Sequence, residues 1–310
     1  MRDSLPPTSA SKPEVVRAAT LGFCFGVRRA VEMALNARRE HPERTIVTCG
    51  PLIHNPAVLA QLAHHNISAL PEIPAGTAYP AAENGVAVIR AHGVSPAVRL
   101  SLERSDYAIL DATCPRVAAN QRRAGLFARQ GYQVLIAGDR NHGEVAGISG
   151  IAPGCVVVEC AEDARRFAES WQARRSGGKT ALLAQTTISR GEYDAIAACL
   201  SARIPGLLVA DTICPATLER QRALIELCRE ADGVLVVGGK DSANTRRLLA
   251  LAAERVSPAA LIESPDEIPP RFFALKRVGI AAGASTPDAL IDAVEQALRA
   301  KGTFKFLQET

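Results

Sequence analysis

Short runs of β-branched and aliphatic residues alternate along the chain with stretches in which apolar residues recur every three or four positions. The short runs predict buried strands. The clearest of them are residues 45–48, 86–89, 134–138, 181–184, 234–238 and 278–281. Residues 27–40 show the other pattern, with Val27, Ala30, Val31 and Ala34 at helical spacing, and they predict an amphipathic helix. Strands that alternate with helices predict an α/β fold with parallel sheets.

A cysteine recurs at the start of three helix-like stretches. Cys24 lies in GFCFG, Cys114 in DATCP and Cys214 in DTICP, and each follows a short strand-like run. A polar loop residue follows these cysteines after 30, 28 and 28 positions, respectively: His54, His142 and Ser242. A second one follows after 68, 72 and 71 positions: His92, Thr186 and Ser285. Such regular offsets predict three repeats of one α/β unit.

The repeats predict three similar small α/β domains in a pseudo-threefold trefoil. The expected divisions are a disordered tail at 1–12 and units at 13–101, 102–206 and 207–310, and the strand before each cysteine can pair with the preceding unit. Ligands of parallel sheets gather beyond the carboxyl ends of the strands, which is where the polar loop residues lie. We therefore expect these residues to line one central cavity.

Composition narrows the class of protein. The chain has 310 residues, 47% of them apolar and 22% charged, with a net charge of +4. This weakly basic balance suits an anionic ligand and argues against a nucleic-acid partner. The sequence has no apolar run of membrane-spanning length and no secretory signal, which predicts a cytoplasmic protein without a membrane partner. Eight cysteines in that setting indicate metal binding or buried thiols.

Three equivalent thiolates predict a metal or metal-cluster site with one open position, where metal chemistry takes place. Zinc is compatible with three cysteines, but a cubane cluster with one uncoordinated iron fits three widely separated thiolates better. Helix amino ends and imidazoles favour a multiply charged oxyanion such as a diphosphate. Glu144, two residues after His142, is the expected proton carrier.

Eight motifs occur in order over residues 15–290: GFCFGVRRAV, GPLIHNP, AHGVS, DATCP, NHGEVAG, AQTTIS, DTICPAT and AAGASTP. Together they resemble the 4-hydroxy-3-methylbut-2-enyl diphosphate reductase family, iron–sulfur enzymes of the methylerythritol phosphate pathway. The resemblance implies a trefoil around a central 4Fe–4S cluster on Cys24, Cys114 and Cys214. It implies these diphosphate contacts: His54, His92, His142, Ser242, Asn244 and Ser285. It also implies that Thr186 contacts the substrate hydroxyl and that Glu144 relays protons, which makes these two and His142 the expected catalytic residues.

The function implied is an oxidoreductase of isoprenoid biosynthesis. It would reductively dehydroxylate 4-hydroxy-3-methylbut-2-enyl diphosphate to isopentenyl and dimethylallyl diphosphates with two electrons and two protons. Because the sequence lacks a Rossmann glycine fingerprint, we expect an external electron donor such as ferredoxin or flavodoxin. Two alternatives remain open: a zinc-dependent hydrolase on the same cysteines, and a non-catalytic iron–sulfur sensor. Ala243, Arg116 and Leu218 differ from the family pattern.

Overall fold

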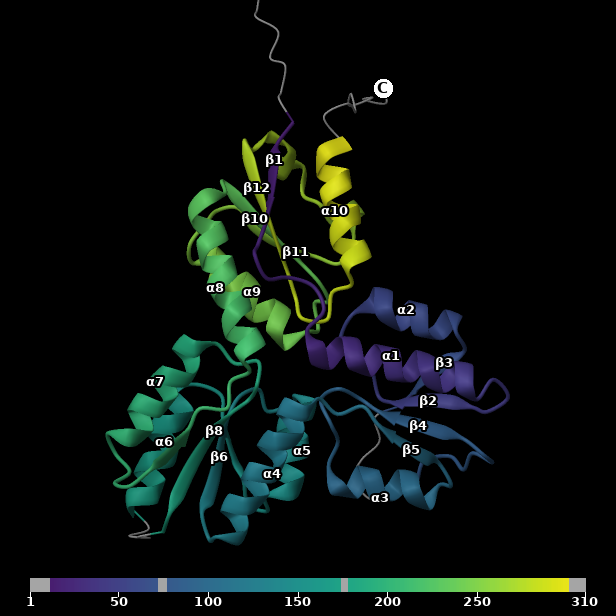
Figure 1. The fold of residues 1–310 in the computed structure, drawn as a ribbon. Helices are drawn as coiled ribbons and strands as arrows, with labels where there is room; N and C mark the ends of the chain where they lie inside the picture. Colours follow the sequence, from purple (N-terminus) through teal and green to yellow (C-terminus); the bar gives the residue numbers. More distant parts are fainter. Residues whose placement is uncertain (1–11, 72–76, 174–177, 301–310) are drawn as a thin grey trace, which may run out of the picture. The chain divides into compact units, whose positions relative to one another are not determined.

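The computed structural model describes residues 12–71, 77–173 and 178–300 (Figure 1). Within these residues the chain forms three four-stranded sheets, and every paired strand in them is parallel. This confirms the α/β fold class predicted from the repeats. The predicted disordered tail lies outside the described residues except for Lys12. None of the helices in these ranges has the length and apolar character needed to cross a membrane.

The chain divides into two compact units. Unit 1 comprises the segment up to Gly22 and the segment from Arg220 onward, and unit 2 runs from Phe23 to Glu219. Unit 2 contains two of the three sheets, and unit 1 contains the third. The domain boundaries expected from the repeats and the threefold arrangement stay predictions.

The first sheet of unit 2 has the strand order β3-β2-β4-β5. Its strands are β2 (Ile46–Cys49), β3 (Ile67–Leu70), β4 (Val86–Ile89) and β5 (Ala108–Asp111). Its helices are α1 (Phe25–Glu40), α2 (Pro56–His64) and α3 (Pro96–Arg104). Ile46 packs with α1 and α2, while the next residue, Val47, packs with α3. The helices therefore cover both faces, and this explains why every residue of β2 and β4 is buried.

The second sheet of unit 2 has the order β7-β6-β8-β9. Its strands are β6 (Gln133–Ala137), β7 (Val156–Val158), β8 (Thr180–Ala184) and β9 (Leu208–Ala210). Its helices are α4 (Pro115–Arg129), α5 (Gly143–Ile151), α6 (Ala161–Ala173) and α7 (Arg190–Ser201). Leu135 packs with α6 and α7, and Ile136 packs with α4 and α5 on the opposite face.

The sheet of unit 1 has the order β1-β12-β10-β11. Its strands are β1 (Glu14–Arg17), β10 (Gly233–Val237), β11 (Ala259–Ile262) and β12 (Arg277–Ala282). Its helices are α8 (Pro215–Glu230), α9 (Ala243–Ala253), α10 (Asp288–Ala300) and two short 3₁₀ turns, η1 (Pro265–Glu267) and η2 (Pro270–Ala274). Leu235 packs with α10, whereas Val236 packs with α8 and α9.

An edge strand precedes each repeated cysteine. In the three sheets β5 pairs with β4, β9 with β8, and β1 with β12. Each of these edge strands leads through a short loop to Cys114, Cys214 and Cys24, respectively, and the next helix begins directly after the cysteine. The fold thus places each thiol between the carboxyl end of a strand and the amino end of a helix.

Candidate functional site

The three repeated cysteines all lie in unit 2, and the backbone fixes two of them in the same way. The Cys114 N–H donates to the carbonyl oxygen of Ala91 (3.0 Å), and the Cys214 N–H donates to that of Thr186 (3.0 Å). Both acceptors lie two residues beyond the end of a central strand, β4 or β8. The equivalent contacts show that the sequence repeat has a structural counterpart.

Cys24 and Cys214 both lie close enough to Cys114 to influence its thiol electrostatically. Burial raises the pKa of the Cys114 thiol, and the charges of Cys24 and Cys214 raise it further. Backbone N–H groups of Arg116 and Val117 act in the opposite direction, because they stabilise the thiolate. A bound cation or cationic cluster would offset the repulsion between the three thiolates, and this makes the set suitable for a metal group.

The geometry around Cys114 leaves no room for a side chain at Gly26. A Cβ atom added at Gly26 would lie 2.5 Å from the Cys114 sulfur. Within the described ranges, no three His, Cys, Asp or Glu side chains converge closely enough to hold one metal ion. A cubane cluster takes one thiolate on each of three irons, so its ligands do not need to meet at one ion. The thiols and the glycine that makes way for one of them fit such a cluster.

We predict that Gly26→Ala lowers the iron content of the anaerobically purified protein, because the new methyl group would displace the Cys114 sulfur. Gly191→Ala is the matched control, since Gly191 also lies in the first turn of a helix and has open space around it. Iron and acid-labile sulfide analysis measures the effect. Equal iron in both variants would show that the Gly26 contact does not position the thiol.

Three imidazoles from three loops form a row in unit 2. The His92 ring centroid lies 5.0 Å from that of His54 and 5.0 Å from that of His142. His142 caps α5, and its Nδ1 accepts the N–H of Glu144 (3.2 Å), which puts the ring proton on Nε2. The Nδ1 of His92 is buried and has no hydrogen-bond partner among the described residues. A buried polar atom without a partner is well placed to form a hydrogen bond with a bound ligand.

The pKa of His92 lies well below its usual range. Burial is the main cause, followed by the charges of His142, His54 and Arg90. Protonation is therefore less favourable in the folded protein than in the unfolded chain, where the pKa is about 6.5. His92 contributes stability that is fully present above that pH and is lost as pH falls toward the folded-state value.

We predict that the apparent free energy of unfolding of the wild-type protein falls as pH is lowered from about 7.5 to 5.5. The slope due to this one group approaches about 1.4 kcal/mol per pH unit. His92→Gln should reduce the slope, whereas His64→Gln, at the end of α2, should leave it unchanged. Urea titrations at several pH values measure it. Identical slopes for the three proteins would contradict the assignment to His92.

Glu144 is the most deeply buried carboxylate described in unit 2, with 1% of its surface exposed. Its oxygens accept the Thr186 hydroxyl (2.7 Å), the Thr186 N–H (3.0 and 3.2 Å) and the Asn120 amide (3.1 Å). The Thr186 carbonyl in turn accepts the Thr217 hydroxyl (2.9 Å) and the Cys214 N–H. A continuous chain of contacts therefore joins the carboxylate, through Thr186, to one of the repeated cysteines.

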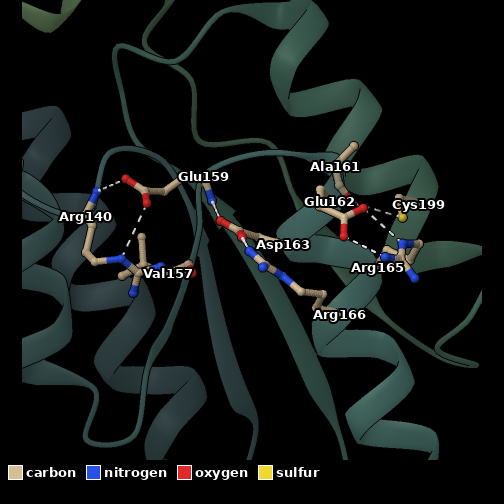
Figure 2. Close-up of polar contacts among 9 residues, drawn as sticks. All are labelled: Arg140, Val157, Glu159, Ala161, Glu162, Asp163, Arg165, Arg166 and Cys199. Carbon is tan, nitrogen blue, oxygen red and sulfur yellow. Dashed lines mark hydrogen bonds and ion pairs between the residues drawn. The ribbon is translucent and has the colours of Figure 1, made fainter.

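The loop that carries His142 is held from both sides. The Asp139 N–H donates to the Gln185 side chain (2.8 Å), and the Arg140 N–H donates to Glu159 (2.8 Å). Figure 2 shows the second of these anchors, in which the Glu159 N–H also donates to Asp163 at the start of α6 (3.0 Å). These contacts hold the loop against its neighbours, so that the scaffold fixes the positions of His142 and Glu144.

Sequence reasoning missed two residues of this arrangement, Asn120 and Thr217. Asn120 also donates to the Ala184 carbonyl (2.8 Å) and so ties α4 to the end of β8. It lies on the buried side of α4 together with Val117 and Ala124. Two buried amides, Asn120 and Gln121, among the apolar residues of that face are the signal that could have revealed it.

Three residues of the predicted diphosphate site belong to unit 1. Ser242 caps α9 by accepting the Thr245 N–H (3.3 Å), and Ser285 is buried in the loop after β12. Asn244 is buried, and its amide nitrogen has no partner among the described residues. These residues follow β10 and β12, as the repeat predicted. Their joint action with the histidines of unit 2 stays a prediction.

Known proteins resemble this chain over most of its length. The family model described as LytB protein matches residues 15–299. The 4-hydroxy-3-methylbut-2-enyl diphosphate reductase of Treponema pallidum (strain Nichols) is 47% identical, with 93% of this chain and 84% of the relative covered. The same-named protein of Treponema denticola is 44% identical (92% and 98% covered), and that of Aquifex aeolicus is 35% identical (92% and 96% covered).

Two solved structures are also similar. One is of (E)-4-hydroxy-3-methyl-but-2-enyl diphosphate reductase, the terminal enzyme of the non-mevalonate pathway; it is 32% identical, with 93% of this chain and 99% of that chain covered, at a TM-score of 0.64. The other, the reductase from Plasmodium falciparum, shares the fold at 24% identity and a TM-score of 0.81, with 92% and 88% covered. The resemblance seen in the motifs is thereby confirmed, and the chain belongs to the LytB protein family, whose curated members include these reductases.

Proposed function

We propose that this protein reduces 4-hydroxy-3-methylbut-2-enyl diphosphate to isopentenyl and dimethylallyl diphosphates. The observation that carries the proposal is the buried Glu144–Thr186 pair beside the Cys214 loop. The reaction removes a hydroxyl group as water, which requires a proton donor close to an electron source. The names of the relatives support the same substrate.

Cys24, Cys114 and Cys214 would hold a 4Fe–4S cluster, one thiolate on each of three irons. When bound, the cluster supplies electrons one at a time and a Lewis-acidic iron that carries no protein ligand. The chain itself supplies the remaining functions, which are binding, orientation and proton delivery.

Glu144 and Thr186 would deliver protons. The Thr186 hydroxyl already donates to Glu144 at 2.7 Å, which is a distance suited to proton transfer. In its protonated form, Glu144 can return a proton to the threonine oxygen as the threonine hydroxyl passes its own to the leaving group. Asn120 holds the carboxylate in place and carries no transferable proton itself.

His54, His92, His142, Ser242, Asn244 and Ser285 would bind the diphosphate. The unpartnered nitrogens of His92 and Asn244 support this role, because a buried polar atom without a partner costs free energy until a ligand contacts it. The Nε2–H of His142 is a further donor, since its Nδ1 already accepts a backbone N–H.

Anaerobic purification tests the proposal against the zinc alternative. Iron with an equal amount of acid-labile sulfide, together with consumption of the diphosphate substrate when dithionite is supplied, would support it. Stoichiometric zinc without sulfide, or a loaded protein that leaves the substrate unchanged, would contradict it.

A further inference from the structure

The helices that follow Cys24 and Cys114, α1 and α4, carry exposed aromatic and basic residues that the proposed chemistry does not use. α4 carries four arginines and no carboxylate along its whole length: Arg116, Arg122, Arg123 and Arg129. All four are exposed, and within the described residues none of them takes part in an ion pair. We call these four residues the basic face of α4.

The spacing of these arginines places most of them on one side of the helix. Arg116 and Arg123 are seven residues apart, which corresponds to two helical turns, and Arg122 is adjacent. Leu126, 45% exposed, follows on the same side. The opposite side, including Val117 and Ala124, is buried, and Ala124 packs on the second sheet of unit 2. The basic face therefore points away from the protein core.

The amino end of α1 adds an exposed aromatic ring next to a predicted cluster ligand. Phe25, 73% exposed, follows Cys24 directly and is the most exposed large apolar residue of the described chain. Arg28 lies one turn further along and stacks on the Phe23 ring at 5.6 Å. An aromatic side chain beside arginines is the composition typical of interface hot spots.

Direct contacts join the starts of these two helices. Arg29 of α1 donates to the carbonyl oxygen of Thr113 (3.2 Å), the residue before Cys114. Gly26 lies against the Cys114 sulfur, as described above. Asp111, the last residue of β5, is the nearby carboxylate, and Arg99 already pairs with it at 2.9 Å. Arginines therefore outnumber carboxylates around the starts of α1 and α4. The exposed carboxylate in the middle turns of α1 is Glu32.

We propose that Phe25 and the basic face of α4 form a docking site for a small acidic one-electron carrier. The carrier delivers electrons at the amino ends of α1 and α4, next to Cys24 and Cys114. The inference rests on the proposed function, because each turnover needs two electrons from outside the chain. Two reduced carriers each lose one electron, and the substrate with two protons becomes product and water. Opposite charge would bring the carrier in rapidly and let it leave after each electron.

A flavodoxin, as an acidic carrier, provides the test. The double variant Arg122→Glu/Arg123→Glu reverses the basic face without touching a cluster ligand or a substrate residue. Arg39→Glu/Arg104→Glu is the matched control, since both arginines are exposed in the last turns of α1 and α3. Binding of flavodoxin to the anaerobic holoenzyme is measured by titration at low salt and at about 0.15 M salt, where charge effects weaken.

We expect the basic-face reversal to weaken flavodoxin binding at least about tenfold at low salt, with the control changing it no more than about twofold. Phe25→Ala, with iron content verified, should weaken binding at both salt concentrations. Turnover driven by dithionite should be the same in the reversal variant as in the wild type. Wild-type flavodoxin affinity in the reversal variant would overturn the proposal, as would tighter binding of a DNA duplex than of flavodoxin. The titration measures docking and does not depend on turnover. Absence of dithionite-driven turnover in the wild type would instead contradict the proposed function.

Discussion

Replacing Glu144 with glutamine is expected to lower turnover by about 10²–10⁴-fold, the usual loss when a general acid is removed. Glutamine keeps the size of the side chain and a carbonyl oxygen that can accept the Thr186 hydroxyl and N–H. Its amide protons, however, are not acidic enough to be transferred. Iron content and substrate affinity should therefore stay near the wild-type values, and the loss should appear in kcat.

Glu162→Gln is the matched control for this substitution. Glu162 is also a carboxylate in the first turn of a helix, but it is exposed and pairs with Arg165 (Figure 2). Its neutralisation should leave turnover unchanged. Both variants are assayed anaerobically with dithionite, and affinity is followed by spectral titration. A Glu144→Gln enzyme with wild-type kcat would refute the relay, and one without iron would make Glu144 a structural residue.

Serine in place of Cys24, Cys114 or Cys214 is expected to remove most of the iron and all turnover above background. The hydroxyl is a poor replacement for a thiolate as an iron ligand. The charges of both Cys24 and Cys214 act on Cys114, so we treat the three thiols as one set and expect each loss to have a similar consequence.

Two cysteines outside the repeated set, both of them buried, serve as controls for the ligand assignment. Cys49 lies against the Tyr79 hydroxyl at 3.7 Å, and Cys228 packs in the apolar core of unit 1. Cys49→Ser and Cys228→Ser should keep iron and sulfide near the wild-type amounts. If all five variants lost iron equally, the repeat would have identified the wrong thiols.

The central strands could be predicted from sequence because they are buried on both faces. Residues 86–89 were predicted and observed as a strand, and residues 234–238 differ by one position from β10. The edge strands β3, β7 and β11 were not predicted. Each is only partly buried, so it lacks the continuous buried run that marks a central strand.

The residues of the candidate site also fall into those that could be predicted from sequence and those that could not. The cysteines and the histidines could be proposed because they occupy positions that recur at fixed offsets, and Glu144 could be proposed because it lies two residues after one of these positions, His142. Asn120 and Thr217 could not, because their roles depend on which side of a helix meets the end of β8 or the Thr186 carbonyl. The pairing of β1 with β12 likewise joins distant parts of the chain, and no local pattern encodes it.

Analysis of the products formed in deuterium oxide tests the central claim most directly. The wild-type holoenzyme would be supplied anaerobically with 4-hydroxy-3-methylbut-2-enyl diphosphate and dithionite, and the products identified by nuclear magnetic resonance. Reduction with proton delivery predicts isopentenyl and dimethylallyl diphosphates, each with one solvent deuterium on carbon and an intact diphosphate. A dephosphorylated alcohol without deuterium on carbon would reveal a hydrolase and contradict the account.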